Sequence, residues 1–131
     1  MKRIALIAII LLIIPASNHA QNLTNRFFFA YADESLTIDN TSGGIGFTAS
    51  KITSTSGPGL SAQSATFTIN CTSGTSCPIR MTIDGTAPTT TVGLRADYGQ
   101  SVTIYAQTNI VNFRAIREGS TSAKIDVSYA R

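Results

Sequence analysis

Apolar residues recur at every second position in several short stretches of this 131-residue chain. The clearest case is residues 65–71, where Phe67, Ile69 and Cys71 share one side and the residues between them are polar. Such a period of two predicts β-strands with one buried face. The alternating apolar sets are Leu36/Ile38, Ile45/Phe47, Phe67/Ile69, Ile79/Met81/Ile83, Val102/Ile104, Val111/Phe113/Ala115 and Ile125/Val127/Tyr129.

Turn-forming segments rich in Gly, Ser, Thr and Pro separate these sets, at residues 40–44, 53–59, 84–88 and 118–122. No segment carries a convincing 3.6-residue apolar period, so we expect at most one helical turn, near residues 106–109. About seven short strands with one apolar face each predict an all-β chain, either a two-sheet sandwich or a small barrel. We favour a single antiparallel β-sandwich over residues 34–131, of immunoglobulin-like or jelly-roll-like arrangement.

Two neighbouring runs, residues 65–71 and 79–83, are expected to form a central hairpin around the turn-forming string 72–76. The only two cysteines, Cys71 and Cys77, flank that turn and can face each other across the mouth of the hairpin. We therefore predict a structural disulfide. A redox or metal pair is the alternative, but the spacing is not C-x-x-C and the two further soft ligands that zinc needs are absent.

The N-terminal residues 1–20 have the three parts of an export signal. Lys2 and Arg3 precede the apolar run 4–14, and a short segment ending in the small residue Ala20 follows it. The run is too short for a membrane-spanning helix, which needs roughly twenty apolar residues. We therefore expect cleavage after Ala20, a secreted, periplasmic or extracellular location, and no membrane attachment afterwards. Thiols are oxidised in those compartments, which favours the disulfide.

An N-terminal arm, residues 21–33, precedes the regular pattern. It contains Phe27, Phe28, Phe29 and Tyr31, which are four of the ten aromatic side chains. Consecutive aromatic residues cannot all face one side of a strand. We expect the arm either to complete the core as a strand buried on both faces, or to offer an apolar surface to a protein partner or a second copy by strand addition.

Charge and composition remove several function classes. Two of the ten basic side chains, Lys2 and Arg3, belong to the expected signal, which leaves eight against seven acidic ones and little support for nucleic-acid binding. Cleavage would also remove His19, the only histidine and the usual base for a serine or cysteine nucleophile. Most acidic residues occupy turns or exposed strand positions, and no D-x-D-x-D-G calcium loop occurs. We expect no catalytic residue, no metal and no cofactor.

Carbohydrate is the ligand class that the composition leaves open. Sugars stack their apolar faces on exposed aromatic rings while their hydroxyl groups need polar partners. Trp is absent, and the two tyrosines expected to be exposed are Tyr98, in a loop, and Tyr105, opposite the apolar face of its strand. These two rings are the candidate sugar-binding surface.

Three stretches carry a resemblance to known families: IRMTIDGTAPTTTVG at residues 79–93, NFRAIR at 112–117 with IDVSY at 125–129, and TSGGIGFTA at 41–49. They resemble small virion structural or decoration proteins of tailed-phage and metagenomic genomes, over residues 35–129. The motif IRxTxDGTxPT within the first stretch is also similar to the immunoglobulin-like C-terminal domain of chitobiase-type hexosaminidases, an accessory β-sandwich. That second resemblance covers fewer residues, and neither family brings a catalytic residue to transfer.

The resemblance implies a structural part in an assembly, whereas the export signal, the aromatic arm and the cysteine pair depart from the phage-like pattern. We predict a non-catalytic, exported structural or interaction module, in a virion-like or cell-surface assembly. The alternative is a carbohydrate- or cell-wall-binding accessory module.

Overall fold

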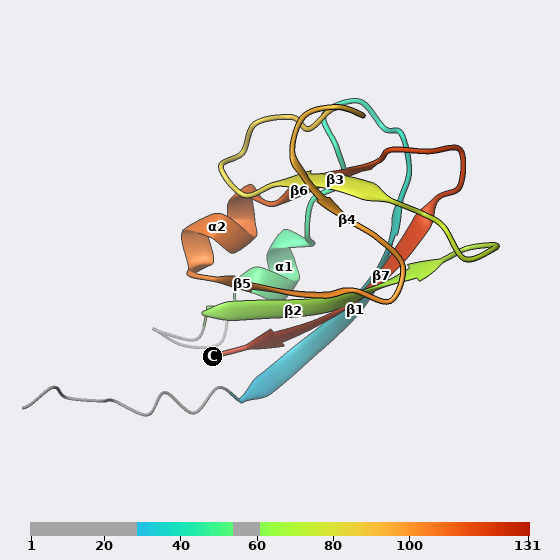
Figure 1. The fold of residues 1–131 in the computed structure, drawn as a ribbon. Coiled ribbons are helices and arrows are strands. Elements are labelled where there is room, and N and C mark those ends of the chain that lie inside the picture. Colours follow the sequence, from blue (N-terminus) through green and yellow to red (C-terminus); the bar gives the residue numbers. More distant parts are fainter. Residues whose placement is uncertain (1–28, 54–60) are drawn as a thin grey trace, which may run out of the picture.

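The computed structural model describes residues 29–53 and 61–131 (Figure 1). In this part of the chain seven strands form two antiparallel sheets, and the predicted all-β sandwich is confirmed. The first sheet has the order β1-β7-β2-β5 and the second has the order β4-β3-β6. The elements are β1 (Ala30–Ile38), α1 (Ala49–Ile52), β2 (Ser64–Cys71), β3 (Ile79–Thr82), β4 (Leu94–Ala96), β5 (Ser101–Tyr105), α2 (Gln107–Asn112), β6 (Arg114–Arg117) and β7 (Ala123–Ala130).

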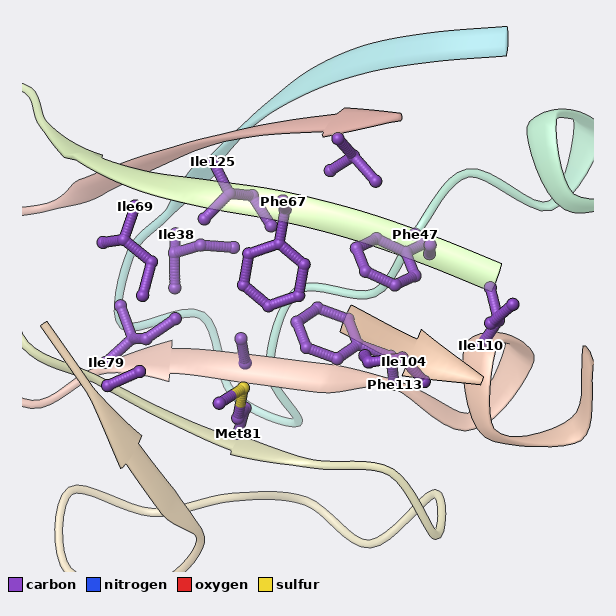
Figure 2. Close-up of a cluster of buried hydrophobic side chains, with 14 of the residues drawn as sticks. Ile38, Phe47, Phe67, Ile69, Ile79, Met81, Ile104, Ile110, Phe113 and Ile125 are labelled. Carbon is purple, nitrogen blue, oxygen red and sulfur yellow. The ribbon is translucent and has the colours of Figure 1, made fainter. Parts of the chain in front are cut away.

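The core lies between the two sheets and consists of the alternating apolar residues (Figure 2). Three phenylalanines form its centre. The rings of Phe47 and Phe113 stack with their centroids 4.1 Å apart, and Phe67 meets Phe47 edge-on at 6.0 Å. Each such aromatic pair contributes about 0.5–1.5 kcal/mol beyond the area it buries. The period-two pattern therefore identified the inward face of the longer strands correctly.

The disulfide between Cys71 and Cys77 is present, with the two Cα atoms 5.5 Å apart. The hairpin predicted around it is wrong, because β2 belongs to the first sheet and β3 to the second. Both edges of β2 are already occupied, by β7 on one side and β5 on the other, so no position beside β2 is left for β3. The disulfide thus closes an arch that carries the chain from one sheet to the other.

The segment around Ile45 and Phe47 was expected to be a strand, but it forms only one isolated bridge, Ile45 with Ala115 of β6. Gly43 and Gly44 both have positive φ, so the chain turns sharply there and brings the next residue, Ile45, beside β6. Each residue of the bridge donates its N–H to the carbonyl of the other, over 2.7 and 2.9 Å. This segment closes the side of the sandwich formed by β1 and β6.

The pattern Val111/Phe113/Ala115 predicted a strand beginning at Val111, but Val111 lies in α2 and β6 begins at Arg114. Within α2 the buried residue is Ile110, whereas Val111 is exposed. Ile110 and Phe113 are both fully buried and three residues apart, the spacing at which helical side chains share a face. The helix expected near residues 106–109 exists, but as six residues rather than a single turn, and the expectation of at most one helical turn is wrong because α1 is a second.

Candidate interaction surface

The side of the sandwich opposite β1 and β6 is open. β5 ends the first sheet there and β4 ends the second, and in the described residues neither has a strand on its outer side. β4 and β5 are consecutive in the chain and are joined by the turn at residues 97–100, but they belong to different sheets (Figure 1). They consequently diverge and leave a wedge between the sheets.

The turn itself is held by Asp97, whose side chain accepts the N–H of Tyr98 at 2.8 Å and the N–H of Cys77 at 3.3 Å. The bond from Tyr98 is the main reason why the pKa of Asp97 lies below its ordinary value. Because Cys77 is one half of the disulfide, the closed end of the wedge is tied to the arch between the sheets.

The wedge contains an apolar hollow, called here the β4–β5 groove, with a volume of about 290 Å³. A second hollow adjoins it and shares Met81, Ile83 and Leu94. The apolar residues that line the β4–β5 groove are Met81, Ile83, Leu94, Val102, Ile104 and Tyr105. The groove is apolar over most of its length and open to solvent, which is typical of a surface that receives another chain.

The sequence pattern explains why this groove is apolar. In the ladder between β3 and β4, Leu94 pairs with Met81 and Ala96 pairs with Ile79. Directly paired residues share a face, so Leu94 lies on the same inward face as the buried Met81. Leu94 is nevertheless 63% exposed, because the first sheet ends at β5 and nothing in the described residues covers it. The groove is therefore an inward-facing apolar part of the second sheet that the first sheet does not cover.

Sequence reasoning missed β4 and hence the groove. The stretch is only three residues long, and its alternation, Leu94 and Ala96 around Arg95, is too brief to predict a strand. Gly93 could have indicated a close backbone approach, since a Cβ atom there would lie 2.9 Å from the carbonyl oxygen of Met81.

The aromatic arm is only partly described, because Phe27 and Phe28 lie outside the described residues. Phe29 is 71% exposed, and its backbone exchanges two hydrogen bonds with Arg131. Tyr31 belongs to β1 and packs against the core rather than forming an outer surface. Its hydroxyl donates to the carbonyl of Lys51 at 2.8 Å, and burial raises its pKa above the ordinary value. Residues 30–33 of the expected arm are thus part of the sheet.

The two candidate sugar-binding tyrosines are exposed, Tyr98 by 50% and Tyr105 by 60%. They lie at opposite ends of β5, with Tyr98 in the turn before the strand and Tyr105 as its last residue. Five strand residues span roughly 16 Å, so the structure does not bring the two rings together. Tyr105 lies at the rim of the β4–β5 groove, where the side chain of Asn109 donates to its carbonyl at 3.0 Å.

Three of the acidic residues, Asp39, Asp84 and Asp97, act in turns. Asp39 accepts the N–H of Thr41 at 2.8 Å, and Asp84 accepts both the N–H and the hydroxyl of Thr86, at 3.0 and 2.7 Å. These hydrogen bonds, with the hydroxyl of the threonine first, hold the pKa of each carboxyl below its usual value. Together with Asp97, these residues lie at separate turns and form no carboxylate pair.

Glu34 is the one carboxylate on the inward side of the first sheet that the structure connects to a buried tyrosine. Its Oε1 accepts the hydroxyl of Tyr129 and the N–H of Thr48, the latter at 3.1 Å. Burial first, and the bond to Glu34 second, raise the pKa of Tyr129 far above its ordinary value. Both partners are satisfied by each other and by Thr48, so the arrangement is structural.

Within residues 29–53 and 61–131 no three His, Cys, Asp or Glu side chains gather as metal ligands would. No helix in the same residues has the length and apolar character needed to cross a bilayer.

Comparisons with protein-family models, with curated proteins and with solved structures gave no match. The class that the structure itself defines is an antiparallel β-sandwich with a disulfide arch between its sheets and an open apolar edge.

Proposed function

We propose that this chain is a non-catalytic, exported structural or interaction module that contacts another protein through the β4–β5 groove. The observation that carries the proposal is Leu94, an inward-facing side chain that is 63% exposed. Covering an inward-facing apolar surface with a partner lowers the free energy of the complex by about 25 cal/mol for each Å² removed from water. Scattered single apolar residues need no such explanation, but Ile83, Leu94 and Tyr105 line one continuous groove.

Export agrees with the disulfide, since oxidising compartments are where such bonds form and persist. A part in a cell-surface or virion-like assembly is the finer form of the proposal, supported by the resemblance of residues 35–129 to virion structural proteins.

Photo-crosslinking in the producing cells tests the proposal. A photoreactive amino acid is placed at Leu94 in the groove, or at Val111, which is 45% exposed on α2 and lies outside it. We expect a specific cross-linked protein from position 94 and none from position 111, together with a mature N-terminus at Gln21. Retention in the cytoplasm, or equal cross-linking at both positions, would overturn the proposal.

A carbohydrate-binding role is the second candidate, and the exposure of Tyr105 beside Asn109 favours it. The ring supplies a stacking surface and the amide a polar partner, although Tyr98 is too distant to complete the site. A glycan array with the Tyr105→Ala variant, and Tyr98→Ala as its control, tests this role. Binding that is lost only in Tyr105→Ala would support it, and an array without binding would remove it.

A further inference from the structure

We infer that the peptide group between Tyr105 and Ala106 is a two-state switch at the rim of the β4–β5 groove. Two hydrogen bonds hold this peptide group in a strained orientation. Its flip releases an N–H of the Asn109 side chain, which then donates to a backbone carbonyl of the protein that occupies the groove. This inference rests on the proposed function and adds a contact and a conformational change to it.

Ala106 has a backbone conformation that an alanine rarely adopts. Its φ is 70° and its ψ is 131°. Left-handed residues other than glycine have ψ near about +30 to +60°, so Ala106 lies outside even that tolerated region. The other described residues with positive φ are all glycines. At Ala106 alone, among the described residues, a side chain is forced into such a conformation.

Only the peptide group before Ala106 needs to turn for the strain to disappear. The ψ of 131° is already that of a β-strand, and only φ is unusual. Rotating this peptide group by about 180° brings φ of Ala106 to roughly −110°, which is ordinary extended backbone. The carbonyl of Ala106 belongs to the next peptide group, so it keeps the hydrogen bond from Ile110 and α2 stays in place.

Two hydrogen bonds oppose the flip, one at the carbonyl and one at the N–H of the same peptide group. The side chain of Asn109 donates to the carbonyl of Tyr105 at 3.0 Å, and the N–H of Ala106 donates to the carbonyl of Gln63 at 2.9 Å. Backbone strain of this kind favours the flipped peptide by about 5- to 150-fold. Two ordinary hydrogen bonds favour the observed orientation by a similar factor. The two orientations are therefore close in free energy, as a switch requires.

The flip changes what the groove offers to a partner. Besides Tyr105, the polar side chains that line the groove are Thr103 and Asn109, and the hydroxyl of Thr103 is bonded to that of Thr66 at 3.0 Å. When the carbonyl of Tyr105 turns away, the N–H of Asn109 that it accepted is released. A partner carbonyl at this place replaces the hydrogen bond that the flip breaks, while the strain at Ala106 is relieved. Occupation of the groove therefore shifts the peptide toward the flipped orientation.

Relaxation-dispersion NMR of the mature, disulfide-bonded chain tests whether the switch exists. We expect microsecond-to-millisecond exchange at the amides of Ala106 and Gln107. Ala106→Gly removes the steric strain, so it should lower the flipped population at least about fivefold and suppress the exchange. Asn109→Ala removes one of the two hydrogen bonds and should raise that population about fivefold, whereas Thr108→Ala on the same helix should leave it unchanged. Absence of exchange in both the unchanged chain and Asn109→Ala overturns the inference.

Urea unfolding shows whether Ala106 is strained. Replacing alanine by glycine normally lowers the urea midpoint, because it gives the unfolded chain more freedom. Ala30→Gly, at an exposed position of β1 without positive φ, is the matched control and should show this loss. Ala106→Gly should keep or raise the midpoint, since relief of the strain offsets the loss. Equal losses in the two variants mean that Ala106 is not strained, which overturns the inference.

Photo-crosslinking in the producing cells tests the link to the groove. Because the partner binds the flipped peptide, Ala106→Gly should reduce the cross-linked product from position 94 at least about fivefold, whereas Ala30→Gly should not. A loss in the variant with the unchanged or higher urea midpoint cannot result from unfolding. Equal product from Ala106→Gly and the unchanged chain overturns the inference while the proposed function stands. No product from the unchanged chain overturns the proposed function itself, and the released contact with it.

Discussion

The hydrogen bond between Tyr129 and Glu34 predicts how the stability of the fold changes at alkaline pH. Tyr129 is fully buried, and its pKa is raised from the ordinary value of 10.0 by burial and by the carboxylate of Glu34. In the unfolded chain the phenol ionises near 10.0, whereas in the folded chain it keeps its proton. The unfolded state therefore binds fewer protons above that pH, and the free energy of unfolding must fall as the pH rises.

The expected loss is about 1.4 kcal/mol for each pH unit above the unfolded pKa, the value for a single titrating group. Tyr31 adds a smaller contribution of the same sign, because burial raises its pKa as well. Below the unfolded pKa of Tyr129 this contribution to stability is fully present, so Tyr129 adds no pH dependence there.

The assay is urea unfolding across this pH range, followed by circular dichroism, for the unchanged chain and for Tyr129→Phe. The substitution removes a hydrogen bond to a charged group and should cost about 1.5–3 kcal/mol near neutral pH. Above the unfolded pKa the two stabilities should converge, because the variant no longer carries the phenol. Tyr98→Phe, at an exposed position, is the matched control and should keep the alkaline slope. Parallel curves for Tyr129→Phe and the unchanged chain would refute the reasoning.

Three other perturbations have expected outcomes. Replacing Cys71 and Cys77 together by Ala should lower the free energy of unfolding by about 2 kcal/mol, the chain-entropy value for so short a loop, and equal urea midpoints with and without the bond would contradict it. Phe113→Ala should lower the free energy of unfolding by about 3–5 kcal/mol, because the ring stacks on Phe47 in a fully buried position. A drop in melting temperature as small as that of a substitution at an exposed residue would show that the core is not built around Phe113. Gly93→Ala should destabilise more than Gly99→Ala, since both have positive φ but only the first would press a Cβ atom against a carbonyl 2.9 Å away, and equal losses of urea midpoint would exclude that contact.

The longer strands could be predicted from the sequence because their inward residues alternate over enough positions. Phe67 and Ile69 in β2, like Ile125 and Val127 in β7, are buried as the pattern requires. Alternation reports which side of a strand is covered, but not which strand lies beside it. The mistaken hairpin of β2 and β3 follows from this limit, because strand partners depend on contacts between distant parts of the chain.

Short elements were harder for a related reason. Val111, Phe113 and Ala115 alternate like a strand, but the burial of Ile110 selects a helix for the first part of that stretch. β4 has three residues, and its pairing with β3 decides its structure more than its own sequence does. The β4–β5 groove depends on where each sheet ends, so no local pattern could have indicated it.

The pairing of Phe29 with Arg131 has a mechanical consequence. β1 and β7 are adjacent and antiparallel, and these two residues meet at the end of their ladder. Opposed forces applied at these two residues would load the hydrogen bonds one pair at a time, beginning there, so the strands would unzip under a small force. A chain pulled by Phe29 and Arg131 would therefore open at this corner of the first sheet long before the core between the sheets is loaded.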